Sequence, residues 1–326
     1  MMRTKCLTFV FGMMFIAAVS CAPTNDVTLY IRALYQNCTD SNNDTLAVKF
    51  LDGSEKFVAQ VSLSHHYIHN ILTKQIKQHE LSRSVARDAL ATFSDHNVVY
   101  FSSRTNYIDG FIAESLEKDP KISQIVVVAA GFDSRAYRIP FAGKYFELDM
   151  PEVVEAKQSK VSENGLKTLG QSVTYVSADL RNISAKDALI AEPTFDRHAR
   201  TIYIVEGLIY YLHQDDVDIL FKSLGEVAST GSPLVFDFTN LCLIEENCSD
   251  LNKYLIKIFL KIMRTKKEPW FSGFVPGAVQ PWLAQWGFET TELLSFQNAG
   301  YPPLNVKSWT NSTIFGQMGF AKAVKK

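Results

Sequence analysis

The chain has 326 residues, of which 47% are hydrophobic and 21% are charged, so it can bury a full core and is not an intrinsically disordered protein. Its 33 basic and 34 acidic residues give a formal net charge of −1, which gives no reason to expect a nucleic acid as a partner. The length suits one large α/β domain with insertions, or two small domains.

Residues 1–22 have the three-part form of a secretory signal peptide. Arg3 and Lys5 precede the apolar stretch Leu7–Val19, which is too short to span a bilayer comfortably, and small residues follow it. We therefore expect an exported protein that is secreted, periplasmic or lipid-anchored. Processing could leave a lipid on Cys21, the one membrane contact that we expect, or could be ordinary cleavage near residue 20 or 22. An uncleaved anchor is the third alternative, and a protein whose signal is not used would be cytoplasmic.

Residues 23–100 are expected to form an N-terminal extension and helical cover in front of a domain that spans residues 101–326. Apolar residues recur at three- and four-residue spacing between Phe57 and Ala91, which is typical of an amphipathic helix. The histidines of this stretch have no acid with a clear partner role beside them, so they predict no metal site; they are His65, His66 and His69.

Two cysteines of the second half, Cys242 and Cys248, are close enough in sequence to form a local disulfide. Two buried thiols are an equally good interpretation. Neither cysteine has a histidine at metal-ligand spacing, so we predict no metal here either.

The central element of the chain is the run Ile125–Val128, which has no polar alternation and is typical of a parallel strand covered on both faces. Small residues follow it at Ala129, Ala130 and Gly131, so the backbone can turn tightly there. In a doubly wound sheet, the turn after such a strand lies at the carboxyl edge, where ligands bind.

Acidic residues end the next three predicted strands. Asp149 ends Lys144–Asp149 and is well placed to accept hydrogen bonds from the two hydroxyls of a ribose. Asp179 follows the strand at residues 173–178, and Leu180 beside it offers an apolar surface to a base; alone, Asp179 could equally cap the helix expected near residues 184–190. Glu206 and a glycine follow the strand at residues 201–205. A buried carboxylate is costly without a partner, so Glu206 suggests a ligand amine or hydroxyl nearby.

The remaining pattern alternates helices and strands and ends in a pair like a hairpin, which predicts one α/β domain. The expected elements are helix Asp215–Val227, strand Pro233–Phe238, amphipathic helix Leu251–Met263, an aromatic loop suited to a lid at Pro269–Gly277, helix Val279–Gln285, strand Phe288–Leu294 and a last strand near Ser312–Gly319.

Arg104 lies in the segment Phe101–Asp109, which we expect just before the helix that leads to the central strand. Its guanidinium could hold a carboxylate in a bidentate manner. Taken alone, Arg104 is better interpreted as a surface arginine that pairs with Asp109.

Five sequence blocks in order make the chain resemble the leucine carboxyl methyltransferase family of S-adenosylmethionine-dependent enzymes. Each block alone is weak, and their order and spacing, over roughly residues 80–320, make the resemblance strong. The blocks are Ser103–Thr105 with Ile108–Asp109, Gly131–Arg138, Phe146–Val153, Ala178–Arg181 and Val205–Leu212.

This resemblance implies a Rossmann-like, seven-stranded, mostly parallel class I methyltransferase sheet with an added N-terminal helical cover and a lid insertion. It also implies a cofactor site for S-adenosylmethionine. In that site Arg104 would hold the methionine carboxylate, Gly131 would let the backbone approach, Asp149 would hold the ribose, Asp179 and Leu180 would frame the adenine, and Glu206 would face the methionine part.

One residue departs from the family pattern. The family has glycine two positions before Gly131, where this chain has Ala129. A methyl group there would be tolerated at a negative φ, and it could narrow the cofactor pocket.

Methyl transfer from a sulfonium is an in-line displacement, which an enzyme promotes by holding donor and acceptor in line. A carboxylate acceptor is already ionised at neutral pH and needs no general base, so we predict no catalytic triad and assign no catalytic residue. Tyr210 and Tyr211 are expected only as substrate contacts. The expected acceptor is a carboxyl or hydroxyl oxygen of a small molecule, or a protein C-terminal carboxylate. The alternatives are a non-catalytic homologue that binds S-adenosylmethionine or S-adenosylhomocysteine, and an NAD-dependent oxidoreductase, for which the glycines expected after Gly131 are missing.

Overall fold

The computed structural model describes residues 46, 97–170, 172–251, 253–265, 267–275, 277–295 and 314–326. The chain divides into two compact units. The first comprises residues 1–106, 242–270 and 296–317, and the second comprises residues 107–241, 271–295 and 318–326. The predicted signal peptide with Cys21, the three histidines and nearly all of the predicted helical cover lie outside the described residues.

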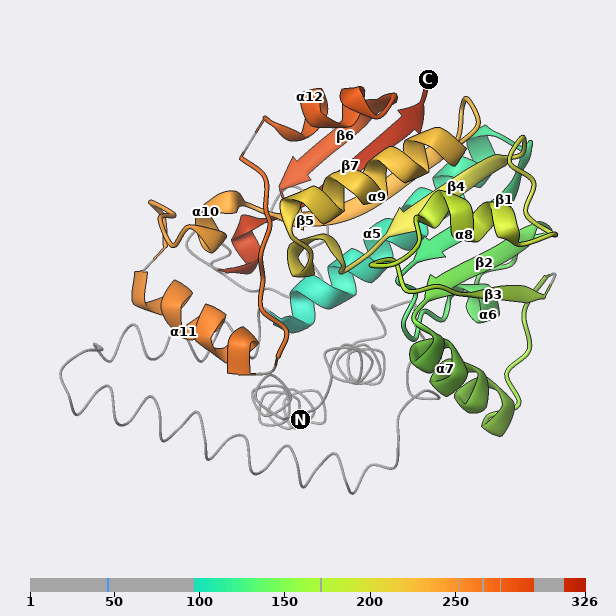
Figure 1. Ribbon diagram of the computed structural model, residues 1–326, viewed down its shortest axis with the longest axis horizontal. Coiled ribbons are helices and arrows are strands. Elements are labelled where there is room, and N and C mark those ends of the chain that lie inside the picture. Colours follow the sequence, from blue (N-terminus) through green and yellow to red (C-terminus); the bar gives the residue numbers. More distant parts are fainter. Residues whose placement is uncertain are drawn as a thin grey trace, which may run out of the picture. The chain divides into compact units, whose positions relative to one another are not determined.

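The second unit is built on a seven-stranded sheet with strand order β3-β2-β1-β4-β5-β7-β6 (Figure 1). Its strands are β1 (Ile122–Val128), β2 (Lys144–Asp149), β3 (Val173–Ser177), β4 (Arg200–Val205), β5 (Pro233–Thr239), β6 (Phe288–Ser295) and β7 (Met318–Lys325). Neighbours among the first five strands run parallel, and β7 is antiparallel to both β5 and β6. The predicted α/β fold class is therefore confirmed, including the closing antiparallel pair.

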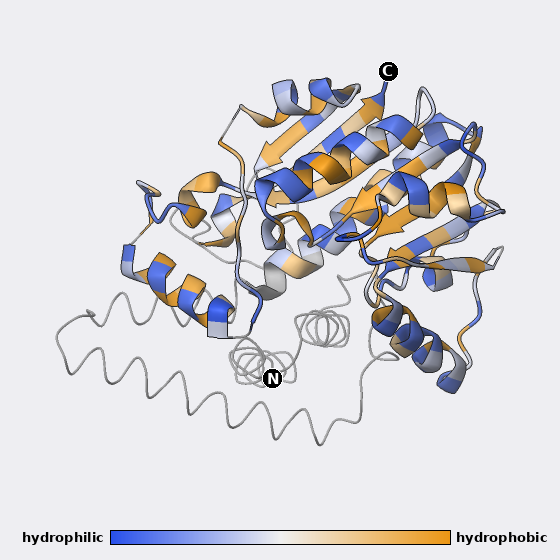
Figure 2. Cartoon of the chain, viewed as in Figure 1, coloured by the Kyte–Doolittle hydropathy of each residue, from blue (hydrophilic) through white to orange (hydrophobic). Residues whose placement is uncertain are grey.

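One face of this sheet carries the main hydrophobic core, against α8 (Ala185–Ala191), α9 (Gln214–Val227) and α12 (Val279–Gln285). Phe146 of β2, Tyr203 of β4 and Phe236 of β5 belong to this core and are fully buried. Figure 2 shows the central strands predominantly in the hydrophobic colour. Truncating one of these aromatic side chains to alanine would cost about 3–5 kcal/mol, because the rigid surroundings would leave a cavity.

The opposite face is covered by the second half of α5 (Asn97–Lys118), by α6 (Arg135–Arg138) and by α7 (Pro151–Glu163). Tyr107 of α5 lies against Phe320 of β7, with ring centroids 4.6 Å apart. Lys157 of α7 forms a buried ion pair with Glu147 of β2. Burial raises the pKa of Glu147 to about 7, and the charge of Lys157 opposes that rise.

Two predicted boundaries are wrong. Residues 101–109 lie inside α5 and not in front of it. The last strand begins at Met318 and not near residue 312, because Phe315–Gln317 forms a short 3-10 turn before β7. Ile314 and Phe315 are buried, so their apolar character resembles a strand although their backbone is not in the ladder.

In the first unit, the amphipathic helix α11 (Lys253–Thr265) buries an apolar face that includes Phe259, whose ring lies 4.8 Å from that of Trp270. Cys242 and Cys248 form a disulfide, which decides between the two interpretations of these cysteines. Among the described residues, no helix has the length and apolar character needed to cross a membrane.

The aromatic loop predicted as a lid is held by backbone hydrogen bonds at residues 271–274, which belong to the second unit. The backbone N–H of Phe271 donates to the carbonyl of Tyr210 at 2.7 Å, and that of Phe274 donates to the carbonyl of Thr239 at 2.9 Å. Closure of this loop over a ligand stays a prediction.

Candidate nucleoside-binding site

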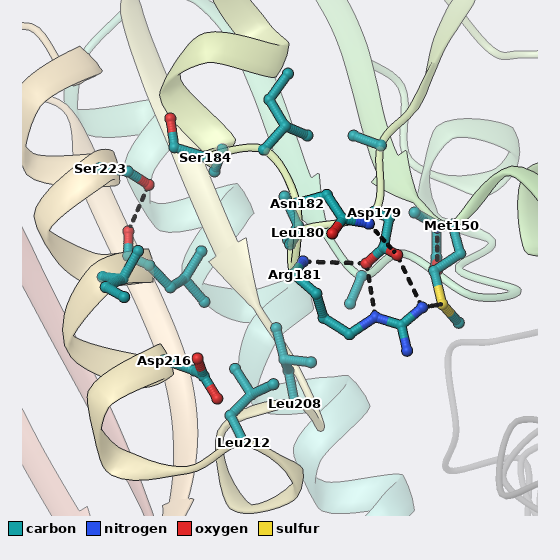
Figure 3. A pocket seen from close by; sticks show the side chains of 17 residues that line it. Met150, Asp179, Leu180, Arg181, Asn182, Ser184, Leu208, Leu212, Asp216 and Ser223 are labelled. Carbon is teal, nitrogen blue, oxygen red and sulfur yellow. Dashed lines mark hydrogen bonds and ion pairs between the residues drawn. The ribbon is translucent and has the colours of Figure 1, made fainter.

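A pocket of about 440 Å³ lies in the second unit at the carboxyl ends of β1, β2 and β3 (Figure 3). This volume is within the usual range for small-molecule sites. Asp149 lines it from the last position of β2, and Ala129 and Ala178 from the positions directly after β1 and β3. The turn after β3 contributes Asp179 and Leu180, and other lining residues come from the segment after β4 and from α9. Three of the six predicted cofactor-binding residues, Asp149, Asp179 and Leu180, therefore line one pocket.

Asp149 is held by the backbones of two loops. Its Oδ2 accepts a hydrogen bond from the backbone N–H of Gly131 at 2.6 Å, and its Oδ1 accepts one from that of Met150 at 2.8 Å. A carboxylate has about four acceptor positions, so these two bonds leave room for about two donors from a ligand. Burial raises the pKa of Asp149, and the two backbone hydrogen bonds partly oppose this rise.

Gly131 does not itself line the pocket, but it fixes the acid that does. Its φ is +48°, in the left-handed region that glycine adopts without strain. The turn after β1 is thereby tied to the end of β2, as expected if the backbone must pass close to a ligand.

Ala129 lines the pocket with a φ of +51°, so the condition for tolerating a methyl group, a negative φ, is not met. An L-residue in this conformation is strained by about 1–2 kcal/mol, because its Cβ crowds its own backbone. The position calls for glycine, and this chain carries alanine at the expense of some stability.

Asp179 is engaged by its own loop (Figure 3). Its carboxylate accepts hydrogen bonds from the backbone N–H and side chain of Arg181 and from the side chain of Asn182. Arg181 lowers the pKa of Asp179. The alternative role of Asp179 as a cap for α8 is wrong, because the Oγ of Ser184 accepts the capping bond from the backbone N–H of Asp187.

Sequence reasoning missed the apolar side of the pocket opposite Leu180. It is lined by Leu208 and Leu212, on either side of the short turn η3 (Ile209–Tyr211), and by Leu220 of α9. Leu208 and Leu212 lie in a sequence block shared with the family, which was the available signal. An aromatic base could lie between these leucines and Leu180.

Glu206 does not line the pocket and has a partner within the chain. Its Oε2 accepts a hydrogen bond from Nη1 of Arg135 at 2.7 Å. Arg135 is completely buried and also pairs with Asp133 and with Asp109, where its Nε lies 2.8 Å from Oδ1. An arginine 71 residues earlier in the chain therefore already supplies a cation to Glu206. A contact of Glu206 with a ligand stays a prediction.

Arg104 belongs to the first unit and is buried on α5, with its guanidinium 4.9 Å from the ring centre of Phe101. Its alternative interpretation as a surface partner of Asp109 is wrong, since Arg104 is buried and Asp109 binds Arg135 and Arg138. The contact of Arg104 with a cofactor stays a prediction.

The strand order and the pocket at the carboxyl edge define a Rossmann-like protein of the class I methyltransferase type. The family model described as leucine carboxyl methyltransferase matches residues 29–225, which is more than half of the 326 residues. The chain therefore belongs to the leucine carboxyl methyltransferase family, as the sequence blocks predict.

Two relatives carry names that refer provisionally to an S-adenosyl-L-methionine-dependent methyltransferase. The protein from Mycolicibacterium vanbaalenii is 38% identical over 139 residues, which cover 42% of this chain and 44% of the relative. The protein from Mycobacteroides abscessus is 27% identical over 245 residues, which cover 72% of this chain and 77% of the relative. In the first comparison the chain spans about half the length of the relative. Membership of this family confirms the predicted cofactor, S-adenosylmethionine.

Two solved structures share the fold. A DUF574 family protein from Streptomyces avermitilis has a TM-score of 0.51 at 15% identity, covering 74% of this chain and 88% of its own. A protein from Thermobifida fusca, provisionally named as a methyltransferase, has a TM-score of 0.51 at 14% identity, covering 75% and 87%.

Proposed function

We propose that this chain is an S-adenosylmethionine-dependent methyltransferase that methylates a carboxyl or hydroxyl oxygen of a small molecule, or the C-terminal carboxylate of a peptide. The carboxylate of Asp149 carries the proposal. It lines the pocket, is anchored by the turn of Gly131, and keeps about half of its acceptor capacity for a ribose. Family membership favours this cofactor over NAD.

The bound cofactor supplies a methyl group on a positively charged sulfur. The chain's own task is to hold the nucleoside end rigidly and to exclude water from the line of transfer. Asp149 fixes the ribose, and the leucine-lined wall packs against the base. An acceptor carboxylate needs no base. Tyr210, which is buried, and Tyr211, which is half-buried, lie three and four residues after Gly207 and remain the proposed acceptor contacts.

The first experiment is calorimetric titration with S-adenosylhomocysteine, followed by transfer of a radiolabelled methyl group to panels of carboxylates and hydroxyl compounds. Mild alkali releases label as methanol from a methyl ester but not from a methyl ether, which separates the two acceptor classes. Absence of S-adenosylhomocysteine binding would overturn the proposal.

The second candidate is a homologue that binds the cofactor without catalysis, and the observation that favours it is the strained Ala129 in the pocket wall. Binding of S-adenosylhomocysteine without transfer to any acceptor, restored by Ala129→Gly, would support this candidate. Transfer by the unaltered chain would exclude it.

We also propose that the protein is exported, with a lipid on Cys21 as its one membrane contact. The Cys242–Cys248 disulfide supports export, because disulfides persist in oxidising compartments. Mass spectrometry of the mature N-terminus after expression in a host with a matching export system tests this. An intact Met1 in a protein retained in the cytosol would contradict it.

A further inference from the structure

The carboxylate of Asp179 has no acceptor position left for a ligand. It receives four hydrogen bonds, at 2.8–3.0 Å, from Arg181 N, Nε and Nη2 and from Asn182 Nδ2. A carboxylate offers about four such positions. The exocyclic amine of an adenine can therefore donate to Asp179 only after one of these donors leaves.

Arg181 is the donor best placed to leave. Its side chain supplies two of the four bonds and is 76% exposed, so water can replace what it loses. The backbone N–H of Arg181 cannot leave as easily, because the turn after Asp179 is closed by bonds from the N–H groups of Asn182 and Ile183 to the carbonyl of Asp179.

The guanidinium also spans the end of the pocket. Its Nη2 lies 4.0 Å from Sδ of Met150, which follows β2, while its other contacts are to Asp179 after β3 (Figure 3). Both Met150 and Asp179 line the pocket. Arg181 thus bridges the ends of two neighbouring strands on the side where the base is expected.

We propose that Arg181 is a displaceable clamp over the nucleobase end of the pocket, which occupies Asp179 in the free protein and must swing into solvent before a 6-aminopurine can be bound there. This inference rests on the proposed function, because it takes the pocket as the nucleoside site. It makes base recognition a competition between an arginine and an amino group for one carboxylate.

The test uses adenosine and inosine as probes, because both are uncharged and differ at the position of the amine. Removal of the clamp in Arg181→Gln should tighten adenosine binding about two- to fivefold, which is the range expected from releasing an exposed ion pair. Inosine, which has no amine to donate, should be unaffected. Arg181→Lys keeps the charge without the bidentate geometry, so its adenosine affinity should lie between that of the unaltered chain and that of Arg181→Gln.

Salt provides a second measurement. Ions screen an exposed pair, so adenosine affinity of the unaltered protein should rise from low salt to about 0.5 M, and that of Arg181→Gln should stay flat. Arg197→Gln is the matched control, since Arg197 is also exposed and lies just before β4, at the opposite end of the strands. It should behave like the unaltered chain.

The outcomes separate the two proposals. If S-adenosylhomocysteine binds but Arg181→Gln leaves both the adenosine affinity and its salt dependence unchanged, or weakens adenosine binding, the clamp is wrong and the proposed function stands. If the unaltered protein binds neither S-adenosylhomocysteine nor adenosine, the proposed function fails and the clamp fails with it. Equal thermal melting of the variants excludes a folding defect.

Discussion

The ends of β2 and β3 carry the same residue type at the same edge of the sheet, yet they are prepared for a ligand in different ways. Asp149 is the last residue of its strand, is anchored by two backbone N–H groups and has a pKa raised by burial. Asp179 lies two residues beyond its strand, is filled by its own loop and has a pKa lowered by Arg181. One acid is preorganised for a ligand, whereas the other must first be released.

The difference follows from where each strand stops. Asp149 still pairs with Ser177 in the ladder, so its side chain is directed by the sheet. Asp179 lies in a turn, where an aspartate readily accepts bonds from the backbone and side chains that follow it. Position in the ladder therefore decides which of two carboxylates is available.

The largest effect is expected at Asp149. In Asp149→Asn, the loss of a charged acceptor should weaken S-adenosylhomocysteine binding about 10- to 100-fold in calorimetry, the usual cost of a hydrogen bond to a charged group. Asn retains the size of the side chain, and circular dichroism checks the fold. If Asp149→Asn lost less affinity for S-adenosylhomocysteine than Asp179→Asn, Asp179 and not Asp149 would be the acid that is ready for the ligand.

The pH dependence of binding should report Asp149. The ribose hydroxyls donate to the ionised carboxylate, and burial raises the pKa of this group, so affinity is full above that pKa and falls up to about tenfold per pH unit below it. Adenosine titrations from about pH 8 to about pH 5 measure this, a range in which the ligand keeps its charge state. Asp149→Asn should show no such slope; a slope that persists there would assign it to another group.

Ala129→Gly should sharpen the contrast by relaxing the pocket wall beside Asp149. Glycine relieves the strain of the positive φ, but it also makes the unfolded chain more flexible, which offsets part of the gain. The net effect should be a fold more stable by about 0.5–1 kcal/mol and S-adenosylhomocysteine binding that is tighter by a few-fold. The measurements are chemical unfolding and calorimetry. Ala130→Gly is the control. Ala130 is buried and does not have a positive φ, so removal of its methyl group should destabilise the protein.

The smallest effect is expected in Asp179→Asn. The amide oxygen can still accept a bond from an adenine amine, while the attraction for Arg181 is lost, so the two changes should nearly cancel. We expect adenosine affinity within about threefold of the unaltered chain. A loss greater than tenfold would show that Asp179 is already free for the ligand in solution.

The sheet was predictable from the sequence because its central strands are uninterrupted apolar runs, such as Ile125–Val128, that end abruptly in small or acidic residues. The start of the last strand was harder to predict. Ile314 and Phe315 are buried at the turn before β7, and their apolar side chains give this segment the composition of a strand. Periodicity cannot distinguish such a short buried turn from a buried strand.

In the site, sequence reasoning could place acids at the ends of strands but could not determine their partners. The bond between Asp149 and Gly131 and the pairing of Glu206 with Arg135 join segments 18 and 71 residues apart. The positive φ of Ala129 could not be known without coordinates, although the family pattern marked the position.

The ion cluster around Arg135 has a consequence for turnover. Among the described residues, the carboxylates of Asp109, Asp133 and Glu206 face the guanidinium groups of Arg135 and Arg138, and these five groups together carry a formal charge of −1. If Glu206 faces the methionine half of the ligand, as the family implies, this excess favours a sulfonium over a neutral thioether. Loss of the positive charge on transfer would then itself loosen the spent ligand and help to empty the site for the next cycle.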